Sequence, residues 1–202
     1  MPLRVAVAVS GGGTDLQALL DALPPGSAAE VVLVVSNKAA SGGLERARRH
    51  GVPAVTLADP AAATEWIDLL RQHRVDLVVL AGYLKLVPAG VVAAYRGQIL
   101  NIHPALLPDF GGPGMYGERV HRAVLASGAR WSGATVHLVD EEFDRGAILA
   151  QAQVPVLADD TPATLAARVL EAEHRLLPRV VLAAAAAGHP VPLDPDLEPQ
   201  GS

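Results

Sequence analysis

The chain has 202 residues, of which half are hydrophobic and only 3% aromatic, and its formal net charge is -5. This length suits one α/β domain with a large aliphatic core, since domains usually contain about 100–200 residues. The modest charge and dispersed basic residues argue against nucleic acid as a partner and favour a small-molecule substrate, and the absence of cysteine excludes disulfides, thiolate zinc sites and a cysteine nucleophile.

The N-terminal residues 1–10 form a short apolar run without the cationic start and cleavage site of a signal peptide. No stretch of the chain approaches the ~18 apolar residues that a membrane-spanning helix needs. We therefore expect a cytoplasmic protein with no membrane partner.

Over the first half of the chain, short β-branched runs alternate with alanine- and leucine-rich segments of helical spacing. The predicted strands are Arg4–Ser10, Glu30–Ser36, Pro53–Leu57, Leu77–Leu80 and Gln98–Asn101. The predicted helices are Asp15–Leu23, Leu44–His50 and Thr64–His73. Nearly continuous apolarity indicates strands buried on both faces, which predicts a doubly wound, mostly parallel sheet.

After residue 110 the pattern changes to a glycine-rich loop, which we expect to be mobile and to lie over the site. Further predicted elements are a helix near Val120–Ala126, strands near Ala134–Val139 and Ile148–Val156, and a long helix from Thr164. Pro162 suits the start of that helix, because proline needs no amide partner in the first turn. Residues 188–202 hold four prolines, so we expect one domain over 1–187 and a loose or surface-bound tail.

The first predicted strand ends in Ser10-Gly11-Gly12-Gly13-Thr14. A glycine loop before a helix favours an anion such as phosphate, but a tight turn capped by Thr14 fits equally well, and both interpretations stay open. Neither a Walker A loop nor the complete dinucleotide fingerprint is present. A carboxylate beside phosphate would be repulsive, so we expect Asp15 to cap the helix or point away.

Asn101 and His103 stand two residues apart at the end of the fifth predicted strand, so their side chains face the same way. An amide donor and an imidazole at this edge suit a reaction that develops an oxyanion, with His103 also passing a proton. A turn cap before Pro104 is an equally good interpretation of the pair alone.

An acidic loop follows the next strand and contains Asp140, Glu141, Glu142 and Asp144. Such a loop is usually just solvated, but a carboxylate reaching His103 would raise the pKa of that imidazole and keep it charged at neutral pH. We expect His137 to be structural or to support a site residue from behind, and His121 to lie on the surface. No ligand spacing indicates a metal site, and no Gly-x-Ser-x-Gly elbow indicates a serine triad.

Five segments together closely resemble the glycinamide ribonucleotide formyltransferases, folate-dependent formyltransferases of purine biosynthesis. The segments are SGGGTDLQALL, SNKAASGGLERAR, VVLAGYLKLVP, LNIHPALLP and GATVHLVDEEFDRGAILAQAQVPV. They follow in order from about residue 3 to about 182, and the combination is specific although LNIHPALLP occurs more widely. The resemblance implies a Rossmann-like fold with antiparallel C-terminal strands.

The resemblance also implies transfer of a formyl group from 10-formyltetrahydrofolate, as cosubstrate, to the amine of glycinamide ribonucleotide. Its catalytic residues fall on Asn101, His103 and Asp144. Its phosphate and glycinamide contacts fall on Gly12, Gly13, Thr14, Asp15 and Glu173, and its folate pocket on Leu84, Lys85, Leu86, Val87, Asp140 and Glu141. It implies no metal, no prosthetic group and no nucleic-acid partner, and a monomer or homodimer.

Three positions depart from the family pattern: Asp15 stands where asparagine is often found, Lys85 where arginine is common, and Arg145 where glycine is common. Rival hypotheses are a deformylase, a formyltransferase with another amine acceptor, and a non-catalytic nucleotide-binding module. The first two carry an extra domain for which 202 residues leave no room, and the last predicts a disrupted Asn/His/Asp set.

Overall fold

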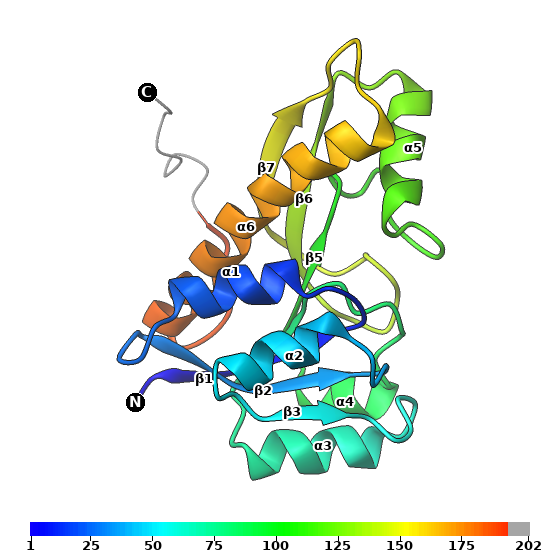
Figure 1. Ribbon diagram of the computed structural model, residues 1–202. Coiled ribbons are helices and arrows are strands. Elements are labelled where there is room, and N and C mark those ends of the chain that lie inside the picture. The colour runs from blue at the N-terminus through cyan, green and yellow to red at the C-terminus, as the bar shows by residue number, and fades with distance from the viewer. Residues whose placement is uncertain (194–202) are drawn as a thin grey trace.

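Seven strands form one sheet in the order β3-β2-β1-β4-β5-β6-β7 in the computed structural model, which describes residues 1–193 (Figure 1). The strands are β1 Leu3–Val9, β2 Ala29–Ser36, β3 Ala54–Thr56, β4 Leu77–Leu80, β5 Ile99–His103, β6 Trp131–Leu138 and β7 Ile148–Pro155. The first five strands are parallel, and β6 and β7 are antiparallel to their neighbours. This confirms the predicted mostly parallel sheet with antiparallel C-terminal strands.

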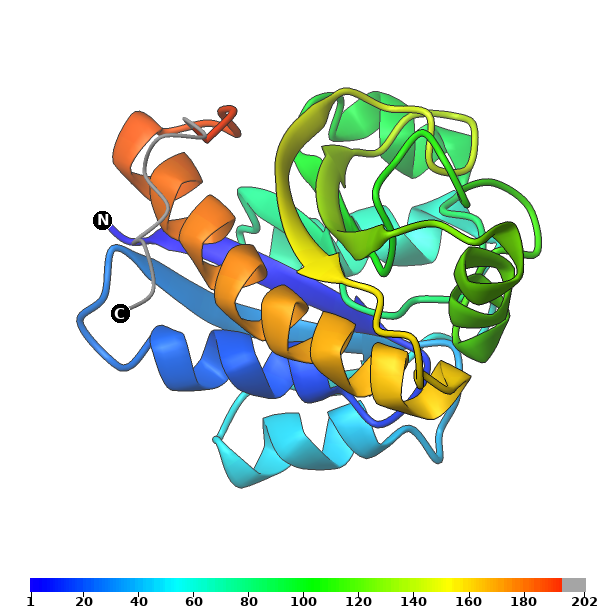
Figure 2. The same cartoon turned by 90° about the horizontal axis from the view of Figure 1, so that it is seen from above.

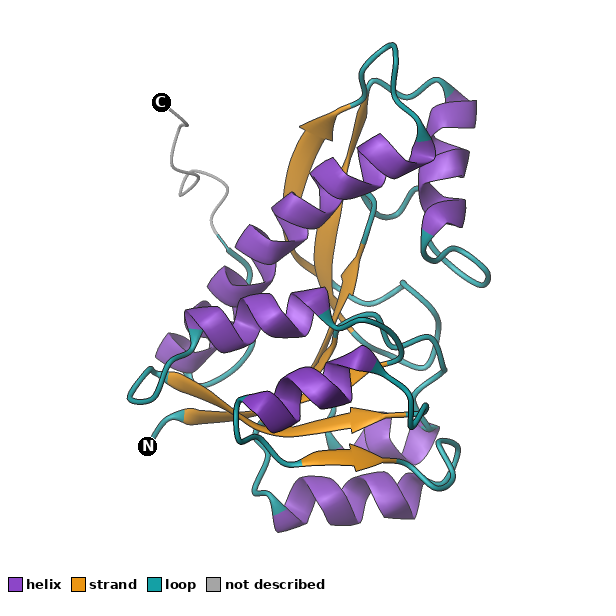
Figure 3. Ribbon diagram, viewed as in Figure 1, coloured by secondary structure: helices purple, strands orange, loops and turns teal. Residues whose placement is uncertain are grey.

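Helices cover both faces of the sheet (Figure 3). They are α1 Thr14–Ala22, α2 Gly42–Arg49, α3 Ala63–Gln72, α4 Ala89–Ala94, α5 Glu118–Ser127 and α6 Pro162–Ala187. Helices α1, α2 and α6 pack on one face, and α3 and α4 pack on the other. The sequence did not predict α4, because its six residues AGVVAA have weak helical propensity and depend on packing against α3.

Strand β1 runs through the middle of the core, and its alternate side chains serve the two faces. Val5, Val7 and Val9 join the cluster with α1, α2 and α6, whereas Ala6 and Ala8 join the cluster with α3 and α4. All five side chains are completely buried. This two-sided burial is the reason why the strand is apolar at every position rather than alternating.

Helix α6 ties the parallel half of the sheet to the antiparallel half. It crosses the molecule beside α1 and reaches β6, β7 and α5 (Figure 2). Its N-terminus is a capping box, in which Thr161 and Thr164 satisfy each other's backbone amides, and Pro162 occupies the first turn as predicted. Beyond the helix the chain returns to β7, where the Leu193 amide donates to the Leu149 carbonyl.

The division into a domain over 1–187 and a tail over 188–202 stays a prediction, because residues 194–202 lie outside the described part of the chain.

The order of strands reverses between β1 and β4, since β2 and β3 lie on one side of β1, whereas β4 and β5 lie on the other. Ligands of open α/β sheets bind in the crevice at this reversal, beyond the carboxyl ends of the strands.

We expect Gly133→Ala to destabilise the protein by about 1–3 kcal/mol, because overpacking a tight contact forces the backbone to move. A Cβ at Gly133 of β6 would overlap the Ala152 carbonyl of β7 and the Leu106 side chain. Chemical denaturation measures the loss. Gly11→Ala is the control, since a Cβ there meets nothing within 4 Å, and equal stability of the two variants would contradict this prediction.

Candidate active site

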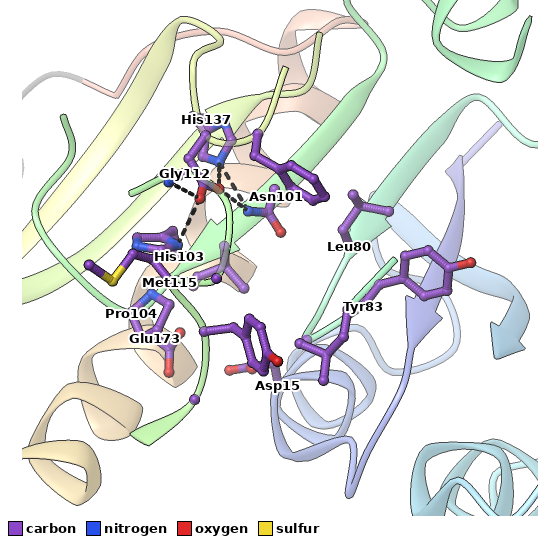
Figure 4. Close-up of a pocket in the computed structure, with 18 of the residues that line it drawn as sticks. Asp15, Leu80, Tyr83, Asn101, His103, Pro104, Gly112, Met115, His137 and Glu173 are labelled. Atoms are coloured by element: carbon purple, nitrogen blue, oxygen red, sulfur yellow. Dashed lines mark hydrogen bonds and ion pairs between the residues drawn. The ribbon is translucent and has the colours of Figure 1, made fainter. Parts of the chain in front are cut away.

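A cavity of about 680 Å³ opens at the carboxyl ends of β4 and β5, beside the reversal of strand order (Figure 4). The glycine-rich loop, the acidic loop and the N-terminal half of α6 complete its wall. Ten of the predicted site residues line it: Asn101, His103, Asp144, Asp15, Glu173, Leu84, Lys85, Leu86, Val87 and Asp140. The fold therefore gathers most of the residues that the sequence assigned to three separate roles.

Asn101, His103 and Asp144 meet inside this cavity. Asp144 Oδ2 lies 3.6 Å from His103 Nδ1, and Asn101 Nδ2 donates to Asp144 Oδ1 at 3.4 Å. The side chains of His103 and Asp144 are 4% and 9% exposed, so these charges interact with little screening by water. Of the two interpretations of the Asn101/His103 pair, the contacts therefore favour a reactive cluster over a simple turn cap.

The glycine-rich loop is fastened to the same cluster (Figure 4). The Gly112 amide donates to Asp144 Oδ2 at 2.9 Å, and His103 Nε2 donates to the Phe110 carbonyl at 2.9 Å. The predicted position of the loop at the site is thus correct, whereas its mobility stays a prediction. Because Phe110 holds Nε2, the proton of a neutral His103 is placed on that nitrogen.

Buried polar contacts from β6 and β7 fix the segment that follows β5. Thr135 Oγ1 donates to the Ala105 carbonyl at 2.6 Å and accepts from the Leu107 amide at 3.1 Å. Gln151 Nε2 donates to the Leu107 carbonyl at 2.9 Å. The turn after His103 is therefore anchored to the antiparallel strands, which limits the orientations that the imidazole can adopt.

His137 supports the site from behind Asn101, which is one of the two roles expected for it. It stands directly opposite Asn101 in the β5–β6 pairing, is 1% exposed, and lines the cavity. Its Nδ1 donates to the Leu138 carbonyl at 2.8 Å, and its Nε2 lies 3.0 Å from Asn101 Nδ2 and 3.5 Å from Asp144 Oδ1. His137 thus holds the amide that we predicted to stabilise an oxyanion.

The prediction that His121 lies on the surface is wrong. It is 5% exposed and lines the cavity. The signal was present in the spacing of α5, because His121 is adjacent to Val120 and three residues before Val124, which are the other buried positions of this helix.

Burial decides the charge of His103, and this corrects the expectation of a charged imidazole at neutral pH. Burial lowers the pKa of His103, and although Asp144 and the Phe110 carbonyl raise it, the pKa stays below its ordinary value. For Asp144 the balance favours ionisation. Burial raises the pKa of this carboxyl, but His137, His103 and the Gly112 amide together bring it below its ordinary value.

The glycine loop after β1 does not line this cavity; Thr14 instead lines a neighbouring hollow with Gln17, Arg46 and His174. The loop carbonyls turn towards α2: Gly11 accepts from the Gly43 amide at 3.1 Å, and Gly12 accepts from Arg46 Nε at 2.8 Å. Helix α1 begins at Thr14, and no side chain caps its start. The interpretation of Thr14 as a helix cap is therefore excluded.

Two predicted site residues differ from one of the expectations for them. Asp15 does not cap α1; it is 9% exposed and lines the cavity, because this face of α1 is covered by α6, whereas Thr14 before it lines the neighbouring hollow. Glu141 does not line the cavity, and instead pairs with Arg96 at 3.1 Å on the exposed side of the acidic loop. Glu142 and Phe143 line the cavity next to Asp140.

Within residues 1–193, no group of three or more histidine, aspartate or glutamate side chains is arranged to hold a metal ion. In the same part of the chain, no helix combines the length and apolarity needed to cross a membrane.

We expect Asp144→Asn to lower the pKa of His103 further, because the substitution removes the negative charge that opposes the effect of burial. The titration of the His103 imidazole, followed by NMR between pH 4 and 8, measures the change without any substrate. Glu141→Gln, which removes an exposed carboxylate of the same loop, is the control. An unchanged His103 titration in Asp144→Asn would disprove the electrostatic pairing.

A family model described as formyl transferase matches residues 3–181. The chain is 50% identical over 186 residues to the chloroplastic phosphoribosylglycinamide formyltransferase of Arabidopsis thaliana, with 88% of this chain and 64% of that protein covered. A similar protein of Vigna unguiculata is covered to 59%. The chain therefore spans less than two thirds of the length of these curated relatives.

Solved structures show the same fold at comparable identity. The phosphoribosylglycinamide formyltransferase from Anaplasma phagocytophilum is similar with a TM-score of 0.86 and 38% identity, covering 93% of this chain and 88% of that chain. The enzyme of the same name from Brucella melitensis gives 0.83 and 44%, covering 92% and 97%. Because the family model matches nearly the whole described chain, and these two solved structures are covered to 88% and 97%, the protein belongs to the formyl transferase family.

Proposed function

We propose that this protein transfers the formyl group of 10-formyltetrahydrofolate to the amine of glycinamide ribonucleotide, a step of purine biosynthesis. The observation that carries the proposal is the meeting of Asn101, His103 and Asp144 in one buried cavity. The similar relatives are phosphoribosylglycinamide formyltransferases by name, which supports the substrate assignment. A cytoplasmic location stays a prediction, because the first curated relatives are named chloroplastic, and so does the oligomeric state.

The cavity offers different chemistry for the two substrates. Leu84, Leu86 and Phe143 expose apolar surface at the rim, and Val87 is buried behind them, which suits the flat ring system of a folate. The loop that carries Leu84 is fixed by Ser10, whose Oγ accepts from the Leu84 amide at 2.9 Å and donates to Asn37 Oδ1 at 2.6 Å. At another part of the cavity, Asp15 and Glu173 supply polar groups that can contact the acceptor.

In the proposed reaction the neutral amine attacks the formyl carbon and a tetrahedral intermediate forms. The amide of Asn101, held by His137, gives up its 3.4 Å contact with Asp144 and donates to the oxygen of this intermediate instead. His103, as a neutral imidazole, donates a hydrogen bond from Nε2 to the same oxygen, and this bond replaces the one that Nε2 makes with the Phe110 carbonyl. Asp144, ionised at neutral pH, accepts the proton of the attacking nitrogen through water, and the same proton passes to the departing folate nitrogen when the carbon–nitrogen bond breaks.

A folate absorbance assay with and without glycinamide ribonucleotide tests the proposed function. We expect turnover of 10-formyltetrahydrofolate that depends on the acceptor and produces formylated acceptor in equal amount. Equal turnover without the acceptor would indicate a deformylase, and no turnover in either case would favour a binding module.

We expect Asn101→Ala and His103→Ala each to lower kcat by about 10²–10³-fold, which is the usual effect of removing one oxyanion donor. Substrate binding should be largely kept, because the lost interaction is made mainly in the transition state. Steady-state kinetics with both substrates measures the effect. Near-normal turnover in either variant would exclude that residue from the oxyanion site.

A further inference from the structure

Two carboxyl groups from different helices share one end of the cavity: Asp15 in the first turn of α1 and Glu173 in α6, which we call the carboxyl pair (Figure 4). They are 9% and 7% exposed. Asp15 Oδ1 has no hydrogen-bond partner among the described residues. A buried oxygen without a partner is costly, so this arrangement points to a ligand or a proton that satisfies it.

The surroundings do not provide full neutralisation of the pair. From α6, His174 Nε2 lies 3.7 Å from Asp15 Oδ1, and this nitrogen also lacks a hydrogen bond in the described chain. Arg46 of α2 is engaged with the glycine loop. Across the cavity stand His103 of β5 and His121 of α5, and burial lowers the pKa of both imidazoles.

The carboxyl pair therefore favours protonated forms. Burial raises the pKa of Asp15 to about 6, although His174 acts in the opposite direction. Burial, and then the charge of Asp15, hold the pKa of Glu173 well above its usual range. As the pH rises through about 6, Asp15 loses its proton first and this end of the cavity becomes negative.

We propose that Asp15 is a specificity-determining residue, which makes binding of the anionic acceptor depend on the uptake of one proton by the carboxyl pair. The inference rests on the proposed function, because the phosphate of the acceptor supplies the negative charge. The uncapped start of α1 favours an anion, and the hollow there is lined by Thr14, which precedes Asp15, and by His174, which lies 3.7 Å from Asp15. A second anion near Asp15 favours its neutral form, so the complex regains the proton that the free protein has lost. Asparagine at this position would carry no charge and impose no such requirement.

Calorimetric titration of the full chain with glycinamide ribonucleotide tests the proposal, with the parent protein and Asp15→Asn compared at pH 5.5, 6.5, 7.5 and 8.5. We expect the ratio of the parent Kd to the variant Kd to be near 1 at pH 5.5 and to reach roughly thirtyfold at pH 7.5, because the complex must then regain a proton 1.5 pH units above the pKa of about 6 of the free carboxyl. The ratio cancels the titration of the acceptor itself. Asp68→Asn, which removes an exposed carboxylate of α3 that lines neither the cavity nor the neighbouring hollow, should leave the parent behaviour unchanged.

A second readout uses two buffers of different ionisation enthalpy at pH 7.5, which count the protons taken up on binding. The parent should take up close to one proton more than Asp15→Asn. A Kd ratio that is constant with pH, or equal proton uptake, would overturn the inference while leaving the proposed function intact. Absence of binding to either protein at every pH would overturn both, and Asp15→Ser provides the same test if the asparagine variant does not fold.

Discussion

Strands β5 and β6 run antiparallel, with Asn101 opposite His137 and His103 opposite Thr135. The rest of the site depends on this register. It lets His137 hold the Asn101 amide and lets Thr135 anchor the turn after His103. It also starts the acidic loop at the end of β6 beside β5, so that Asp144 lies within reach of His103. A slip by one residue would turn every one of these side chains to the other face.

Burial raises the pKa of the carboxyl groups in both parts of the cavity, and the groups around each carboxyl decide the net direction of the shift. Asp144 is surrounded by two histidines and a backbone amide, which more than offset the cost of burying its charge. For Asp15, the effect of burial on the pKa exceeds the opposite effect of His174. For Glu173, the charge of Asp15 adds to the effect of burial, so both pKa values are raised. The pKa of a buried carboxyl group is therefore lowered in one part of the cavity and raised in the other.

The loops of the site are held by elements far away in the chain. Arg46 of α2 donates to a carbonyl of the glycine loop after β1. Asp144 and His103 bind the backbone of the glycine-rich loop that follows residue 110. Helix α6 joins the two halves of the sheet and places Glu173 against α1. Because each loop is fixed by at least one buried or partly buried polar contact, the cavity is preorganised around the reacting groups.

The sequence by itself determined the sheet, most of its helices and the edge at which the site lies. Continuous apolar strands and punctuating glycines are local features, so β4 and the start of α6 could be predicted closely, and the spacing of Asn101 and His103 fixed their common direction. Only the tertiary structure decided the rest. Helix α4, the burial of His121 and Asp15, the outward position of Glu141 and the neutral state of His103 all follow from contacts between distant segments. Desolvation and packing depend on which elements cover a residue, and no local pattern carries that information.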